Sequence, residues 1–214
     1  MIKLFALLLP TLLFSCNAKE RNLPTARTEN ITMELENEFE TATFAGGCFW
    51  CTEAVFLELD GVTKVESGYI GGKTVNPTYK EICTGETGHA EAIRITFDPK
   101  KISYGELLEI FFATHDPTTI NRQGNDVGTQ YRSEIFYNNA AQKTESENYI
   151  ALLNSENTFG KKVVTKISQA PVFYVAEDYH QNYYSRNKDQ SYCSYVITPK
   201  VNKVRTKYKE KLKQ

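Results

Sequence analysis

The sequence has almost no net charge. Its 25 lysine and arginine residues are nearly balanced by 26 aspartate and glutamate residues, which leaves a formal charge of -1. Nucleic-acid-binding domains usually carry a basic excess, so this balance gives no reason to expect nucleic acid as a partner. No internal repeat is visible. The hydrophobic share of 41% and the aromatic share of 12% indicate a globular protein and exclude a disordered one.

Cysteine is too sparse for a disulfide scaffold. Beyond Cys16, only Cys48, Cys51, Cys83 and Cys193 occur in the 214 residues. Cys48 and Cys51 form a CxxC pair, but a zinc ribbon needs a second such pair and the sequence has none. We therefore expect no metal and no cofactor, and a catalytic or redox use of the thiols is the more economical interpretation.

The apolar run near the N-terminus is too short to span a bilayer as a finished helix. It extends from Leu4 to Phe14, the length of a signal-peptide core, and stops at Ser15 and Cys16. A small residue followed by cysteine resembles a bacterial lipoprotein cleavage site. We expect residues 1–15 to be a signal peptide, Cys16 to be lipidated, and residues 16–40 to be a flexible tether. The protein would then be a lipoprotein on the extracytoplasmic or periplasmic face of a bacterial membrane, attached by its lipid alone; an ordinary secretory signal or an uncleaved anchor is the alternative.

Strand and helix patterns interleave through residues 41–214, which we expect to form one domain. Strands are predicted at 40–45, 62–72, 88–98, 133–137, 162–168 and 172–176. Helices are predicted at 48–59, 78–85, 103–116, 140–156, 177–187 and 199–214. The helix at 103–116 opens with a capping box, and residues 117–132 form a long loop of the kind that often carries function. The interleaving predicts an α+β fold with a mixed, mostly antiparallel sheet.

Cys48 is placed to be a nucleophile. It follows Gly46 and Gly47, which let the backbone turn tightly, and it begins a predicted helix. A helix N-terminus stabilises a thiolate, so we expect the pKa of Cys48 to be lowered. Cys51 lies one turn later on the same face, where a disulfide with Cys48 needs only a small adjustment.

Glu91 is placed to be a proton donor. In the strand at 88–98 it shares a face with Ile93, Ile95 and Phe97. An ionised carboxylate on that buried face is costly, so we expect its pKa to be raised and the group to hold a proton near pH 7. Alternatively, the strand begins at Glu91 and the side chain reaches water.

Four segments in order resemble the A-type peptide-methionine sulfoxide reductase family. They are GGCFWCTEAVF (46–56), YKEICTGETGHAEAIRITFDP (79–99), DPTTINRQGNDVGTQYRSEIFY (116–137) and AEDYHQNYY (176–184), and the similarity covers about residues 41 to 200. Such reductases restore one epimer of methionine sulfoxide. The resemblance implies an α/β roll with a ferredoxin-like sheet and thiol-dependent reduction of methionine S-sulfoxide, free or in proteins.

The resemblance also implies roles for individual residues. Phe49 and Trp50 would form an apolar slot for the S-methyl group. The Cys48 thiolate would attack the sulfur and become a sulfenic acid. The implied catalytic set is Cys48, Glu91, Tyr79, Tyr131 and Asp126. Glu91 would protonate the sulfoxide oxygen, and the two tyrosine hydroxyls would point at that oxygen. Asp126 would support the site. Each of these aromatic and acidic residues could instead be ordinary packing or turn chemistry.

The recycling thiols are where the sequence departs from the family. Many members have glycine where this chain has Cys51, and many end in a glycine-rich tail, whereas here the tail carries Cys193. We expect Cys51 to resolve the sulfenic acid first and Cys193, on a mobile final segment, to act second. Cys83 is expected to be buried and inert. A thioredoxin-like partner would reduce the final disulfide.

Two other classes of function are compatible with the sequence. A CxxC thiol-disulfide oxidoreductase would have no need of Glu91 or the tyrosines. A non-catalytic surface lipoprotein would bind a partner through the basic segment 199–214, although such a segment is more often a solvated face. His89, His115 and His180 are expected to have packing or capping roles only, and the protein is expected to be a monomer.

Overall fold

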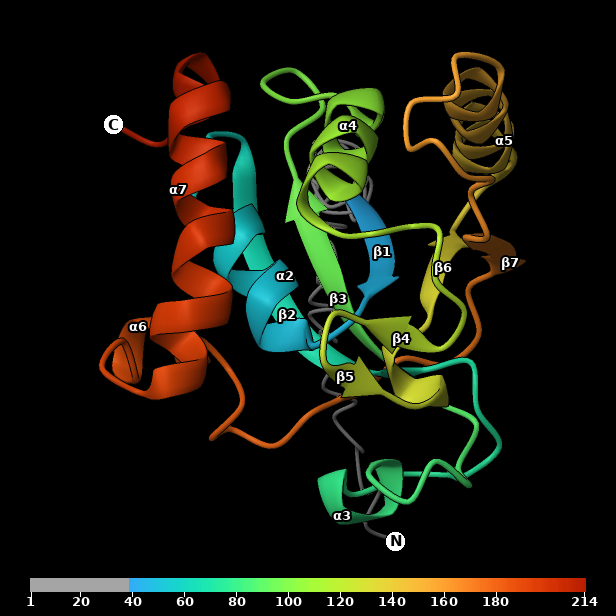
Figure 1. Ribbon diagram of the computed structural model, residues 1–214, viewed down its shortest axis with the longest axis vertical. Coiled ribbons are helices and arrows are strands. Elements are labelled where there is room, and N and C mark those ends of the chain that lie inside the picture. The colour runs from blue at the N-terminus through green and yellow to red at the C-terminus, as the bar shows by residue number, and fades with distance from the viewer. Residues whose placement is uncertain (1–38) are drawn as a thin grey trace, which may run out of the picture.

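The computed structural model describes residues 39–214 (Figure 1). The expected signal peptide at 1–15, the lipidated Cys16 and nearly all of the tether at 16–40 lie outside the described residues. Within residues 39–214 no helix has the length and apolar character to cross a membrane.

The centre of the fold is a six-stranded sheet in the order β7-β6-β1-β3-β2-β8. Four of the five pairings are antiparallel, and β6 with β7 is the parallel pair. The predicted mixed, mostly antiparallel sheet is thereby confirmed. The strands are β1 Glu40–Gly46, β2 Val62–Ile70, β3 Ala90–Phe97, β6 Ser133–Tyr137, β7 Lys166–Gln169 and β8 Tyr174–Val175, and the short hairpin β4 Arg122–Gln123 and β5 Asp126–Val127 lies apart.

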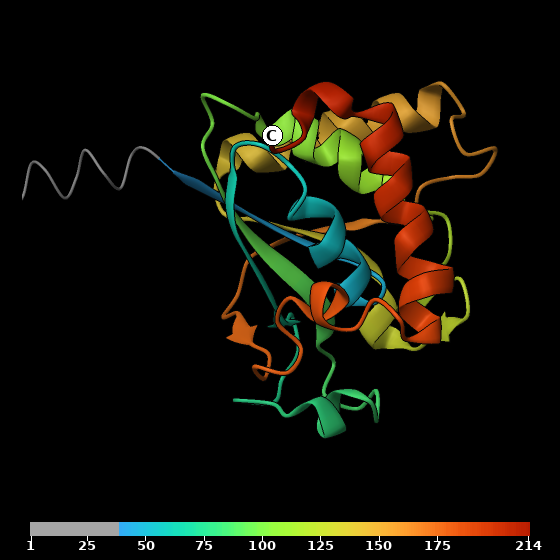
Figure 2. The ribbon, with the colours of Figure 1, turned by 90° about the vertical axis from the view of Figure 1, so that its left-hand side faces the viewer.

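The helices α2, α4 and α7 lie on one side of the sheet, as the turned view in Figure 2 shows. The helices are α2 Phe49–Phe56, α3 Tyr79–Ile82, α4 Tyr104–Thr114, α5 Ala140–Ser155, α6 Tyr183–Arg186 and α7 Thr198–Lys207. Three short helices that are not α-helical complete the fold. They are the 3-10 helices η1 Thr129–Tyr131 and η3 Lys209–Lys211, and the π-helix η2 Cys193–Ile197.

Local sequence chemistry sets two helix starts. The Ser103 hydroxyl accepts the Glu106 N–H at 3.2 Å, and the Glu106 carboxylate accepts the Ser103 N–H at 2.8 Å. This is the predicted capping box, and such a cap contributes about 1 kcal/mol. Thr78 and Glu81 form a second capping box at the start of α3.

The main core fills the space between the sheet and these helices. Phe44 of β1 stacks on Phe111 of α4 with ring centroids 4.8 Å apart, and both are fully buried. Burying such a side chain contributes about 2 kcal/mol. Val201 and Val204 of the basic helix α7 are also fully buried in clusters of the core. This helix is therefore part of the packed domain.

The end of the chain differs from the prediction. The helix predicted at 48–59 ends at Phe56, because Leu59 pairs with Leu212 in an isolated β-bridge and Asp60 N–H donates to the carbonyl of Lys211 at 2.8 Å. The helix predicted at 199–214 accordingly ends at Lys207. This long-range pairing has no local sequence signal.

Candidate active site

The turn before Cys48 requires its two glycines. Gly47 has φ +92°, and a Cβ there would lie 2.5 Å from Cγ of Gln123. A Cβ on Gly46 would lie 2.7 Å from the ring of Phe111. The tight turn is confirmed, and it leaves Cys48 as the N-cap residue of α2, with 7% of its surface exposed.

Glu91 lies on the buried face of β3, as its alternation predicts, and is 1% exposed. Its Oε2 accepts the backbone N–H of Phe49 at 3.1 Å. Burial raises the pKa of Glu91 to about 8, and the Phe49 N–H opposes that shift only in part. The carboxyl therefore holds a proton near pH 7 beside the start of α2, in agreement with the prediction.

The expected lowering of the Cys48 pKa is not what the structure supports. Burial raises the pKa of the Cys48 thiol, and neighbouring Cys51 and Glu91 raise it further. The first backbone N–H of α2 is bonded to Glu91, so it does not serve the thiolate. Hydrogen bonding from Cys48 instead lowers the pKa of Cys51 to about 7, against the opposing effect of burial. Of the two thiols, Cys51 is therefore the one that ionises more readily.

An aromatic group surrounds the second residue of α2. Trp50 Nε1–H donates to Nδ1 of His180 at 3.1 Å, and the indole stacks on Tyr183 at 3.8 Å and 8°. His180 is 1% exposed and also contacts the rings of Phe49 and Tyr79, at 5.0 and 4.4 Å between centroids. This histidine orients the indole, a role that sequence reasoning missed because the partner lies 130 residues away.

Tyr79 and Tyr131 both lie close enough to Glu91 for its charge to affect the pKa of their hydroxyls. Burial raises the pKa of each hydroxyl, and the Glu91 charge is the next contribution for both. Tyr131 also packs against the buried cluster of Cys48 and Cys51. Neither phenol therefore ionises near neutral pH, so both remain hydrogen-bond donors.

Glu177 is a second residue that the sequence reasoning missed. Its carboxylate accepts the backbone N–H of Tyr79 and the hydroxyl of Tyr69, both at 2.8 Å. It thereby fixes the start of α3, which carries Tyr79. Its position in the segment 176–184, which carries a family motif, was the available signal.

The environments of Cys83 and Cys193 are the reverse of those expected. Cys83 is exposed at the end of α3, where its thiol lies against Tyr79, so the expectation that it is buried is wrong. Its helix has only four residues, and Ile82 alone takes the buried position. Cys193 is 0% exposed and lies in one cluster with Cys48 and Cys51, whereas a mobile segment was expected. The four cysteines within residues 39–214 all have free thiols.

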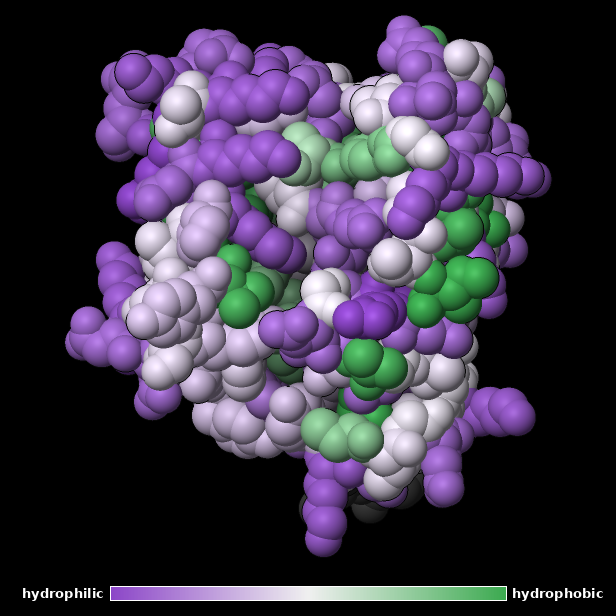
Figure 3. Space-filling view, in the orientation of Figure 1, coloured by the Kyte–Doolittle hydropathy of each residue, from purple (hydrophilic) through white to green (hydrophobic). Residues whose placement is uncertain are grey.

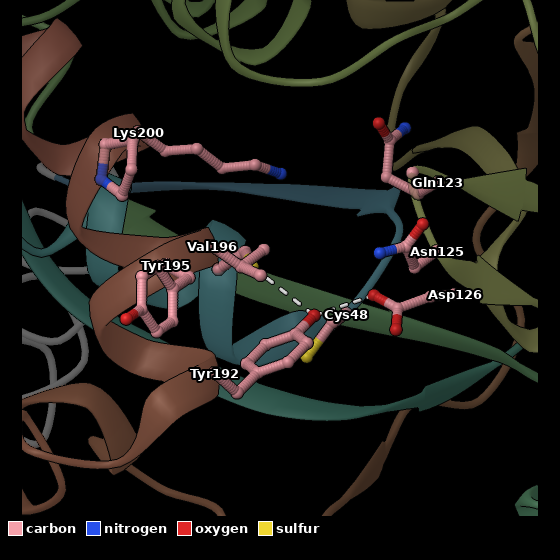
Figure 4. Close-up of a pocket in the computed structure, with 11 residues that line it drawn as sticks. Cys48, Gln123, Asn125, Asp126, Tyr192, Tyr195, Val196 and Lys200 are labelled. Carbon is pink, nitrogen blue, oxygen red and sulfur yellow. Dashed lines mark hydrogen bonds between the residues drawn. The ribbon is translucent and has the colours of Figure 1, made fainter.

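A cavity of about 520 Å³ opens beside Cys48 (Figure 4). Cys48 and Cys51 lie on one side of it, and the β4–β5 hairpin contributes Gln123 to Asp126. The opposite wall is the segment that contains Tyr192, Val196 and Lys200. Among the described residues Glu91, Tyr79, Tyr131, Phe49 and Trp50 do not line this cavity, so it adjoins Cys48 from the Cys51 side.

Asp126 is held by a residue absent from the predicted set. The hydroxyl of Tyr192 donates to Oδ2 of Asp126 at 2.6 Å and lies 3.8 Å from Sγ of Cys51. The Tyr192 ring also meets Trp50 edge-on at 6.0 Å between centroids.

The fold thus gathers the predicted residues around the start of α2. Phe49, Trp50, Cys51 and Cys193 pack around Cys48. The remaining predicted residues come from β3, α3, η1 and β5: Glu91, Tyr79, Tyr131 and Asp126. Cys16 lies outside the described residues. Within residues 39–214 no group of three or more histidine, cysteine or acidic side chains is arranged to hold a metal ion.

The face of the molecule that carries this cavity is mostly hydrophilic. Figure 3 shows hydrophilic side chains over most of this face, with hydrophobic ones in small groups only. A broad apolar docking surface is therefore not a feature of this side.

Comparison with known proteins finds one consistent similarity. Residues 40–212 match the family described as peptide methionine sulfoxide reductase. The chain is 60% identical over 174 residues to peptide methionine sulfoxide reductase MsrA of Deinococcus radiodurans, covering 81% of this chain and 84% of that protein. It is 57% identical over 172 residues to the enzyme of that name from Sulfolobus acidocaldarius, covering 80% and 97%.

Solved structures agree with this similarity. Reduced Mxr1 of Saccharomyces cerevisiae superposes with a TM-score of 0.67 and 34% identity, covering 73% of this chain and 90% of that one. Methionine sulfoxide reductase A of Corynebacterium diphtheriae superposes with a TM-score of 0.64 and 35% identity, covering 74% and 79%. The architecture described above is therefore one that these enzymes share.

Proposed function

The chain belongs to the peptide methionine sulfoxide reductase family and reduces methionine sulfoxide, and from that premise we propose that Cys48 receives the sulfoxide oxygen as a sulfenic acid. The observation that carries this proposal is that the buried Cys48 has a proton donor and a second thiol as neighbours. Glu91 holds a proton beside the first turn of α2, and Cys51 is the thiol of the pair that ionises more readily.

The protons on these groups define the first step. The Cys51 thiolate takes the proton of the Cys48 thiol, and the Cys48 sulfur attacks the sulfoxide sulfur. Glu91 gives its proton to the sulfoxide oxygen, while the hydroxyls of Tyr79 and Tyr131 donate hydrogen bonds to it. The oxygen leaves with Cys48 as Cys48–S–OH, and methionine is released; the sulfoxide is reduced and Cys48 is oxidised.

The substrate is the S epimer of methionine sulfoxide, free or in proteins. Its S-methyl group enters the apolar slot of Phe49 and Trp50, whose indole is fixed by His180 and Tyr183. A pocket that holds the methyl on one side and the oxygen at Glu91 distinguishes the two epimers, because exchanging these groups would place the polar oxygen on the aromatic rings.

Cys51 resolves the sulfenic acid and Cys193 acts second. Condensation of Cys51–SH with Cys48–S–OH forms a disulfide and water. The Cys193 thiol then attacks Cys51, which transfers the disulfide to Cys51–Cys193 and restores the Cys48 thiol. A thioredoxin-like dithiol reduces this second disulfide. The shared cluster of Cys48, Cys51 and Cys193 supports both exchanges.

Counting methionine without any reductant tests this scheme. Wild type should release two methionines per enzyme, because Cys48 is regenerated once. Cys193→Ser should release one and stop as Cys48–Cys51, and Cys51→Ser should release one with a longer-lived sulfenic acid. A Cys48–Cys193 disulfide that forms in Cys51→Ser as fast as the wild-type sulfenic acid decays would show that Cys193 resolves first, and no methionine from wild type would contradict the proposed function.

The location rests on the sequence alone. We propose that Cys16 carries the lipid that attaches the protein to the membrane, with a polar segment between it and the catalytic domain. Mass spectrometry of the membrane fraction should find a diacyl- or triacylglyceryl adduct on Cys16. A mature protein that begins at another residue without lipid would contradict this.

A further inference from the structure

Tyr192 connects a resolving thiol to a carboxylate. Its hydroxyl donates to Oδ2 of Asp126 at 2.6 Å and lies 3.8 Å from Sγ of Cys51. Figure 4 shows the ring reaching from the C-terminal segment past Cys48 toward Asp126. The contact joins segments 66 residues apart on one side and 141 apart on the other.

The direction of these two hydrogen bonds follows from the number of protons. A tyrosine hydroxyl carries a single proton, and here that proton is donated to Asp126. Once Cys51 has taken the proton of Cys48, the hydroxyl oxygen can therefore act only as acceptor toward it, and the Cys51 S–H is the donor. The resulting chain runs from the Cys51 thiol through Tyr192 to the Asp126 carboxylate.

The resolving step needs such a path. In the proposed function, on which this inference rests, Cys51 takes the proton of Cys48 during the first step and must lose it before it can attack. Cys51 is 1% exposed, so water has little access to that proton. Asp126 lines the cavity and is part-exposed.

We propose that Tyr192 is a catalytic proton relay that deprotonates Cys51 for attack on the Cys48 sulfenic acid. Cys51–SH gives its proton to the Tyr192 oxygen as Tyr192 gives its own to Asp126. The Cys51 sulfur then bonds to the Cys48 sulfur, and the S–OH bond breaks. Asp126, which lines the same cavity as Cys48, returns the proton to the leaving hydroxide, so one thiol and one sulfenic acid become one disulfide and one water.

The test compares Tyr192→Phe with Tyr195→Phe in the full-length enzyme. Tyr195 lies on the same segment, is 82% exposed and points away from Asp126 in Figure 4. After one equivalent of methionine S-sulfoxide without reductant, both variants should release methionine. Formation of the Cys48–Cys51 disulfide should slow by about 10²-fold in Tyr192→Phe, the range of positioned proton transfer, with the sulfenic acid trapped by dimedone. Tyr195→Phe should behave as wild type.

A chemical rescue separates a relay from a packing role. Imidazole buffer should restore disulfide formation in Tyr192→Phe, and the rate should rise with pH, since an external base then removes the Cys51 proton. Equal rates of disulfide formation in wild type and Tyr192→Phe would overturn the relay while leaving the proposed function intact. Slow formation that neither buffer nor pH restores would overturn it too, because it would show that the ring only packs. A folded Tyr192→Phe that releases no methionine would place Tyr192 in the first step instead.

Discussion

Replacing Glu91 with glutamine should impair activity and stabilise the folded protein at alkaline pH. The amide keeps an oxygen for the Phe49 N–H, which Glu91 accepts at 3.1 Å, and nearly the same shape. It cannot give up a proton to the sulfoxide oxygen. We expect kcat/KM to fall by roughly 10²–10⁴-fold, the range for a positioned general acid.

The stability effect follows from the shift in the pKa of Glu91, from 4.5 to about 8. Above pH 4.5 the unfolded chain loses this proton, whereas the folded protein keeps it until about pH 8. Stability contributed by the protonated carboxyl is therefore complete below pH 4.5 and is lost as the pH rises to about 8. A shift of that size corresponds to at most about 5 kcal/mol, at about 1.4 kcal/mol per pKa unit.

Urea unfolding of wild type and Glu91→Gln at pH 5 and pH 9 measures this difference, because other titrating groups cancel between the two proteins. The stability of the variant relative to wild type should increase by several kcal/mol from the lower to the higher pH. In parallel, kcat/KM of wild type should decline above about pH 8, as the donor loses its proton. A stability difference that does not change with pH, together with full activity of the variant, would refute the assignment of Glu91 as a buried acid.

Three further outcomes follow from the described contacts. His180→Ala should raise KM for methionine sulfoxide about tenfold and shift the fluorescence of Trp50, the only tryptophan. His180→Asn keeps a hydrogen-bond acceptor for the indole N–H, so both changes should be smaller. An unchanged KM in both variants would contradict the positioning role of His180. Iodoacetamide should label exposed Cys83 in the folded enzyme well before buried Cys193, and the reverse order by peptide mapping would contradict their burial. Gly47→Ala should lower the free energy of unfolding by about 1–3 kcal/mol in urea, since its φ is +92°, and an unchanged midpoint would show that the turn tolerates a side chain.

Local patterns predicted the frame of the site. The alternation around Glu91 placed it on the buried face of β3, and the two glycines before Cys48 predicted the turn that starts α2. The capping box at Ser103 was confirmed atom by atom. Each of these signals involves residues within about one strand or one helical turn of each other, which is the range that sequence periodicity reports.

The electrostatics of the thiol pair could not be predicted in this way. The pKa of Cys48 depends on burial by the whole domain and on Glu91, which reaches the start of α2 across 42 residues. Tyr192 and His180 were missed for the same reason, since their partners lie in distant segments. The environments of Cys83 and Cys193 depend on how a four-residue helix and a π-helix turn their side chains.

The proposed reaction depends most on the Cys48 sulfur as the atom that receives oxygen from one epimer. The most direct test is turnover of the separated S and R epimers of methionine sulfoxide by wild type and Cys48→Ser, with dithiothreitol as reductant. Wild type should consume the S epimer and leave the R epimer, and Cys48→Ser should consume neither, because a serine hydroxyl is scarcely ionised at neutral pH. Appreciable turnover of the S epimer by Cys48→Ser, or equal consumption of both epimers by wild type, would contradict the proposed reaction.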